Sequence, residues 1–109
     1  MKQWDTFDFE FEHGLHPCVI LSRTARCQNP AFETVNILSA SSHRATRLPL
    51  DHEFILDAAD GMDWETLVRL DFVWTARKTD LKRQRKEVSS ERRRALGAKL
   101  IRWFGLLTP

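Results

Sequence analysis

The stretch Thr-Phe-Asp-Phe-Glu-Phe-Glu at residues 6–12 decides the fold class. Phe7, Phe9 and Phe11 alternate with acidic residues, so one face of the segment is aromatic and the other is charged. A period of two is typical of a half-buried β-strand, because successive side chains on a strand point to opposite faces. The sequence therefore predicts that the chain opens with a strand.

Further short strands are predicted downstream of this segment. Apolar or β-branched runs at residues 18–21, 34–38, 46–50 and 53–56 indicate strands, with Pro49 placing the third at an edge or bulge. Residues 23–32 are polar and predict a loop, and residues 64–66 predict a helical turn. The run TLVRLDFVW at residues 66–74 predicts one longer strand. Its apolar face would hold Val68, Leu70, Phe72 and Trp74, and its other face Arg69 and Asp71.

The end of the chain predicts one long helix. A basic connector at residues 80–86 leads to Ser89-Ser90-Glu91, where a hydroxyl can cap the helix and an acidic side chain follows in its first turn. Apolar residues then recur at helical spacing as far as Phe104, and Gly105 is a typical helix terminator. About six strands and one helix predict a mainly β fold, a barrel or curled sheet with the C-terminal helix packed on it.

Composition predicts a single globular domain over residues 1–109. Hydrophobic residues make up 42% of the chain and charged residues 29%, which argues against disorder. No apolar run approaches the length of a membrane helix, and the acidic start does not resemble an export signal. Cys18 and Cys27 are expected to be reduced thiols, so we expect a cytoplasmic protein.

Charge is divided unequally along the chain. Residues 1–72 contain six basic and twelve acidic residues, a net −6, whereas residues 73–109 contain eleven basic and three acidic residues, a net +8. A basic patch attracts phosphates whatever the nucleotide sequence, so this split suggests an anionic partner or an acidic protein. The alternative is a solvated helix face with many charges.

The sequence contains no metal-binding or cofactor-binding motif. The four histidines lack metal-ligand spacing, and the four glycines do not form a phosphate loop. We therefore expect neither a metal nor a cofactor.

The best chemical candidates are Arg69 and Asp71, which share one face of a predicted strand. An arginine can hold a phosphate with its planar fork of donors, and an aspartate can accept a proton or orient the arginine. The alternative is an ordinary surface ion pair. His16 could be a general acid or base, or an exposed residue of a turn. The hydroxyls of Ser41 and Ser42 could bind a phosphate oxygen, or cap a turn.

The order of these features resembles the MazF/PemK/Kid family of bacterial toxin endoribonucleases. Each motif is short, but together they follow the family's order over nearly the whole chain. They are WDTF at 4–7, GLHPCVILS at 14–22, TVNILSASS at 34–42, TLVRLD at 66–71, TARK at 75–78, and a C-terminal helix introduced by Val88-Ser89.

The resemblance implies an SH3-like, partly open barrel that forms a homodimer. It implies a type II toxin that arrests growth as an mRNA interferase, a metal-independent hydrolase that cleaves single-stranded RNA to a 2′,3′-cyclic phosphate. A cognate antitoxin would neutralise it. The implied catalytic residues are Arg69, Asp71, Ser41 and His16. At the position of His16, just before Pro17, the family usually has an arginine. The residues expected to bind RNA are Asp5, His13, Ser42, Thr66, Arg77 and Lys78.

Two other functions remain open on the same fold. One is a non-catalytic, CcdB-like toxin that inhibits DNA gyrase, since the sequence WFGL at 103–106 loosely resembles the tail with which that family recognises its target. The same residues are also interpreted as the packed side of the helix. The other is a nuclease-inactive RNA-binding module, which would bind RNA in a salt-dependent way without forming product.

Overall fold

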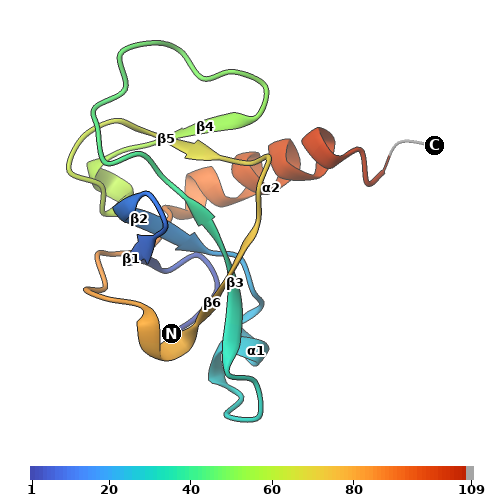
Figure 1. Ribbon diagram of the computed structural model, residues 1–109. Coiled ribbons are helices and arrows are strands. Elements are labelled where there is room, and N and C mark those ends of the chain that lie inside the picture. The colour runs from blue at the N-terminus through green and yellow to red at the C-terminus, as the bar shows by residue number, and fades with distance from the viewer. Residues whose placement is uncertain (108–109) are drawn as a thin grey trace.

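Two antiparallel sheets and a C-terminal helix make up the fold in the computed structural model, which describes residues 1–107 (Figure 1). In the described chain, a four-stranded sheet has the order β1 (Thr6–Phe11), β2 (Gly14–Ile20), β3 (Thr34–Ser39) and β6 (Trp74–Arg77). A two-stranded sheet pairs β4 (Glu53–Leu56) with β5 (Thr66–Arg69). The mainly β fold class is confirmed.

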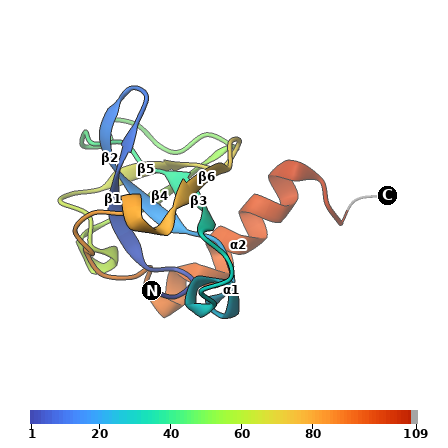
Figure 2. The ribbon, with the colours of Figure 1, turned by 60° about the horizontal axis from the view of Figure 1, so that its bottom comes forward.

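Backbone bridges join the sheets into a curled half-barrel. Ala40, just after β3, bridges to Val68 of β5 and so connects the two sheets. On the other side, residues 82–88 run along β1, where the backbone of Asp8 exchanges two hydrogen bonds of 2.8 Å with Lys82. The β1–β2 hairpin stands out from the body in Figure 2, while the loop between β3 and β4 arches over β4 and β5 in Figure 1.

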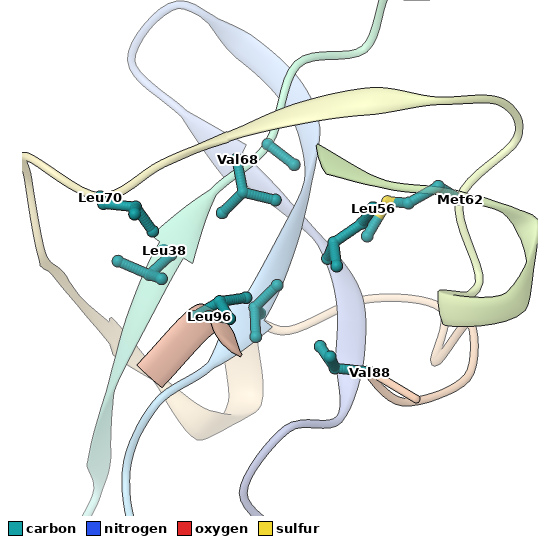
Figure 3. Close-up of a cluster of buried hydrophobic side chains, with 9 residues drawn as sticks. Leu38, Leu56, Met62, Val68, Leu70, Val88 and Leu96 are labelled. Atoms are coloured by element: carbon teal, nitrogen blue, oxygen red, sulfur yellow. The ribbon is translucent and has the colours of Figure 1, made fainter. Parts of the chain in front are cut away.

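The core between the sheets and the helix is apolar and fully enclosed. Figure 3 shows Leu38, Val68 and Leu96 pointing toward one another from β3, β5 and the C-terminal helix. A second cluster fills the space between the four-stranded sheet and the short helix α1 (Thr24–Gln28), and includes Ile20, Cys27 and Ile37. Burial of apolar side chains is the main driving force of folding, and these two clusters hold the sheets and helices together.

The inner end of α2 (Ser90–Phe104) is anchored by charged side chains, of which Asp60 is fully buried. Asp60 follows β4 in a short 3-10 helix (Ala58–Asp60), and its Oδ1 accepts a hydrogen bond of 2.8 Å from the backbone N–H of Ser89. Arg92 pairs with both Asp57 and Asp60, and its hydrogen bonds lower the pKa of Asp57 to about 2. Gly105 ends the helix with φ +66°, as predicted.

The outer end of α2 extends away from the barrel (Figure 2). Leu96 is buried and Leu100 packs against the core, but Trp103 and Phe104 are exposed. The interpretation of these last two residues as a packed face is therefore wrong for the isolated chain. No helix within residues 1–107 has both the length and the apolar character needed to cross a membrane.

Four predicted elements differ in the structure. Residues 66–74 form two strands rather than one, because the chain leaves the β4–β5 sheet after Arg69 and joins β3 as β6. Phe72 lies in the break and is 53% exposed, so its assignment to the core is wrong. No strand forms at residues 46–50 and no helical turn at 64–66, whereas the loop predicted at 23–32 contains α1.

Candidate active site

A groove lies over the ends of β2, β3 and β5 and consists of two hollows. The first, which we call the Arg69 hollow, has a volume of about 510 Å³. The second, the Trp64 hollow, has a volume of about 260 Å³. His16 and Ser41 line both hollows and therefore mark the point where they meet.

Arg69 and Asp71 form a bidentate ion pair at the Arg69 hollow. β5 ends at Arg69, Leu70 turns into the core, and Asp71 returns to the side of Arg69 at a bend. Arg69 donates from Nε to Oδ1 of Asp71 at 3.0 Å and from Nη2 to Oδ2 at 2.7 Å. These hydrogen bonds lower the pKa of Asp71 and raise that of Arg69, so both groups are charged at neutral pH. The two side chains lie side by side, as the sequence predicts.

A second bidentate pair, Arg47 with Glu53, lines the same hollow. Arg47 donates from Nη1 and Nη2 to the two carboxylate oxygens of Glu53, at 2.6 and 2.9 Å. Glu53 is buried, also accepts a hydrogen bond from the backbone N–H of Leu50, and has its pKa lowered to about 2, chiefly by Arg47. Sequence reasoning missed this pair, because Arg47 comes from a loop that carries no motif.

Glu53 also connects the two pairs. It lies directly opposite Arg69 in the β4–β5 ladder, and its negative charge contributes to the raised pKa of Arg69. Opposite charges on facing strand positions stabilise a sheet. Arg69 is therefore hydrogen-bonded to one carboxylate, Asp71, and feels the charge of a second, Glu53, on the neighbouring strand.

His16 enters the groove from β2. Its ring centroid lies 4.6 Å from that of His13, and within residues 1–107 its Nδ1 is buried with no hydrogen-bond partner. A buried nitrogen without a hydrogen-bond partner is costly, and a role of the residue in catalysis is one explanation for it. Both histidines line the Arg69 hollow, so the structure brings them together with Arg69.

The serines at the end of β3 lie at the centre of the groove. The Ser41 Oγ accepts a hydrogen bond of 3.0 Å from the backbone N–H of His43, which is the turn-capping role that the sequence leaves open for this residue. Thr66 is buried and its hydroxyl donates to the Ser41 carbonyl oxygen at 2.6 Å, so it positions this segment. Ser42 lines the Trp64 hollow.

Three candidate residues lie away from both hollows. Asp5 is buried, and its Oδ2 accepts a hydrogen bond from the backbone N–H of Lys2. Arg77 and Lys78 lie at the end of β6 that pairs with the start of β3. There the Lys78 Nζ donates to the carbonyl oxygens of Arg26 and Asn29 at 2.8 and 2.9 Å. The structure does not bring these three residues to the groove.

Solved structures match the chain over nearly its whole length, although no protein-family model and no curated protein sequence does. An endoribonuclease in complex with its cognate antitoxin, from a mycobacterial species, has a TM-score of 0.84 and 19% identity, over 100% of this chain and 99% of that one. The Mycobacterium tuberculosis toxin MazF-mt6 has a TM-score of 0.77 and 22% identity, over 92% of this chain and 95% of that one. A chain of the MazE–MazF complex from Deinococcus radiodurans has a TM-score of 0.71 and 20% identity, over 96% and 95%.

The chain has the fold of MazF toxins. The partly open barrel with a C-terminal helix, expected from the sequence resemblance, is thereby confirmed. At these identities the likeness concerns the fold, and function depends on the side chains of the site.

Proposed function

We propose that this protein is the toxin of a type II toxin–antitoxin system, an endoribonuclease that cleaves single-stranded RNA without a metal ion. The observation that carries the proposal is that Arg69, His16 and Ser41 line one groove and that Asp71 is paired with Arg69 there. The MazF fold supports it, because the solved structures with this fold include an endoribonuclease bound to its antitoxin.

The proposed mechanism uses the nucleophile that RNA itself carries. Asp71 accepts the proton of a 2′-hydroxyl, whose oxygen attacks the adjacent phosphorus and forms a 2′,3′-cyclic phosphate. Nε and Nη2 of Arg69 bind Asp71, so the guanidinium edge that carries Nη1 is directed at the phosphate and stabilises the added negative charge. Ser41 binds a phosphate oxygen through its hydroxyl.

His16 completes the proton transfer. We assign it the role of general acid, in which an imidazolium donates a proton to the leaving 5′-oxygen after Asp71 has accepted one from the 2′-hydroxyl. The lowered pKa of Asp71 makes it a weaker base than a free carboxylate, but keeps it ready to accept a proton at neutral pH.

The partners we propose are single-stranded RNA, a cognate antitoxin and a second copy of the chain. The exposed apolar residues at the outer end of α2 support a protein partner, since large apolar side chains that gather on a surface often mark an interface. They also favour the second candidate function, a CcdB-like toxin that inhibits gyrase and does not need Arg69 or Asp71.

The test is incubation of the purified protein with mixed-sequence single-stranded RNA in EDTA, beside an Asp71→Asn variant that keeps the shape of the side chain. We expect fragments that end in a cyclic phosphate with the wild-type protein and at least about a hundredfold fewer with the variant. DNA of the same sequence should stay intact, because it lacks the 2′-hydroxyl. Growth arrest by a protein that leaves RNA intact would instead support the gyrase-type function.

A further inference from the structure

The Trp64 hollow has the size and position of a site for one nucleobase. Its volume of about 260 Å³ falls below the roughly 300–1,000 Å³ of clefts that enclose drug-sized ligands, so it fits a single heterocycle. It meets the Arg69 hollow at His16 and Ser41. A base bound there would therefore belong to a nucleotide next to the phosphate held by Arg69.

Apolar side chains provide a surface on which a base can stack. Leu15, Pro17, Met62 and Trp64 line the hollow, and Trp64 is partly exposed. The guanidinium carbon of Arg44 lies 5.7 Å from the centre of a Trp64 ring, which holds the indole in place by a cation–π contact. Unpaired bases stack on such aromatic side chains in proteins that bind single strands.

A chain of alternating charges forms the polar wall of the hollow. Asp8 is buried and accepts hydrogen bonds from Nε of Arg83 at 2.9 Å and from Nε of Arg85 at 2.7 Å. Arg85 also donates to the carbonyl oxygen of Gly61 at 3.0 Å and reaches Asp63 at 3.4 Å. The side chain of Arg85 is only 8% exposed, whereas those of Arg83 and Asp63 are 61% and 59% exposed. A ligand in the hollow would thus meet the side chains of Arg83 and Asp63.

Arg83 is more than a structural partner of Asp8. Arg85 alone already neutralises Asp8 and ties it to the Gly61 loop. Arg83 nevertheless keeps a backbone φ of +34°, in the left-handed region that a bulky side chain adopts only at a cost. Strained residues of this kind concentrate at ligand clamps and active sites.

We propose that the Trp64 hollow is a guanine subsite for the RNA substrate, an inference that rests on the proposed ribonuclease function. Within residues 1–107 Arg83 is bonded only through Nε, so its Nη groups can donate to the acceptors O6 and N7 on one edge of guanine in a bidentate contact. The N1–H and N2–H₂ groups of guanine are neighbouring donors, which suit the carboxylate of Asp63. The other three bases do not combine two adjacent acceptors with two adjacent donors.

The first test maps the cleavage sites in a mixed-sequence single-stranded RNA. We expect guanine at one fixed position beside the cut. Arg83→Ala and Asp63→Asn should each reduce this preference about tenfold or more while the RNA is still cut. Arg94→Ala is the matched control for loss of a positive charge, because Arg94 is an exposed residue of α2 that lines neither hollow. A preference for another base, or a guanine preference that both variants retain, overturns the proposal.

The second test measures binding without cleavage. It uses 2′-deoxy oligonucleotides that carry guanine, inosine or 7-deazaguanine at one position, and follows the indole N–H signal of Trp64, assigned with Trp64→Phe, by NMR. We expect guanine to shift the signal at concentrations at least about tenfold lower than the two analogues, which lack N2–H₂ and N7 respectively.

The two tests separate the subsite from the ribonuclease. A Trp64 shift specific for guanine in a protein that leaves RNA intact supports the subsite and contradicts the proposed function. RNA cleavage without guanine preference, and without a Trp64 shift, overturns the subsite and leaves the ribonuclease standing. Intact RNA with no shift overturns both.

Discussion

Replacing Arg69 with alanine should separate catalysis from stability. The side chains of Arg69 and Asp71 are 54% and 26% exposed, so their ion pair is screened by water and contributes about 0–1 kcal/mol to the free energy of unfolding. In the transition state of RNA cleavage, the same guanidinium would face the added charge on the phosphate. Loss of one such donor costs roughly 3–4 kcal/mol, which corresponds to a rate lowered about a hundredfold to a thousandfold.

The assay is single-turnover cleavage of a labelled RNA oligonucleotide at saturating protein, with thermal unfolding followed by circular dichroism on the same samples. Arg69→Lys is the matched variant, because it keeps the positive charge but loses the planar fork that binds Asp71 and phosphate together. We expect its rate to fall between those of the wild type and Arg69→Ala, with the three unfolding temperatures nearly equal.

Two results would refute this reasoning. A cleavage rate for Arg69→Ala within about threefold of the wild type would show that Arg69 does not stabilise the transition state. A large drop in unfolding temperature with an unchanged rate for the remaining folded protein would assign Arg69 a structural role only.

Three further predictions concern stability. Glu53→Gln should lower the free energy of unfolding by about 1–3 kcal/mol at pH 7, because Glu53 is buried while its partner Arg47 is half exposed. The pKa of Glu53 is lowered from 4.5 to about 2, so its stabilisation is present above pH 4.5 and should disappear as the pH falls toward 2, which urea unfolding at several pH values would measure. Gly61→Ala should destabilise the fold by about 1–3 kcal/mol, because Gly61 has φ +91° and the new Cβ would lie 2.9 Å from the backbone nitrogen of Lys86. An unchanged urea midpoint would contradict this. The matched control is Gly97→Ala within α2, where the new Cβ would have its nearest contact at 3.9 Å. This variant should stabilise the fold by up to about 1 kcal/mol, and a lowered urea midpoint would count against it. Leu96→Ala should lower the free energy of unfolding by about 2–5 kcal/mol in the same measurement, since Leu96 is fully buried in the core. A loss below about 1 kcal/mol would show that the helix packs loosely on the core.

Local patterns in the sequence predicted the elements whose stabilisation is itself local. The alternation at residues 6–12 predicted the position of β1, and Ser89 and Gly105 predicted the bounds of α2, although the Ser89 hydroxyl makes no capping hydrogen bond. Arg69 and Asp71 were expected on one side of the chain, and they are paired there. Helix α1 has only five residues, too few to show a helical period, and could not be recognised in this way.

The break between β5 and β6 depends on partners that are distant in sequence. An alternating apolar pattern shows which residues share a face, but not which strand each residue pairs with. β5 pairs with β4 and β6 pairs with β3, so the chain must change sheets between them. The backbone N–H of Leu70 donates to the carbonyl oxygen of His52 at 2.8 Å at the end of the first pairing, and Phe72 then faces solvent at the Arg69 hollow.

The change of sheet also determines the electrostatics of the proposed active site. Because β5 pairs with β4, Glu53 lies opposite Arg69, and the groove carries the order Arg47, Glu53, Arg69, Asp71 with alternating sign. Two positive and two negative charges cancel, so these four side chains alone give RNA little net attraction to the groove. Their value lies in orientation, because a guanidinium fixed by two hydrogen bonds to Asp71 need not reorganise when charge develops on the phosphate. Preorganised donors of this kind supply much of the rate enhancement in many enzymes. The sequence shows Arg69 and Asp71 as neighbours, but only the fold places the negative charge of Glu53 opposite Arg69.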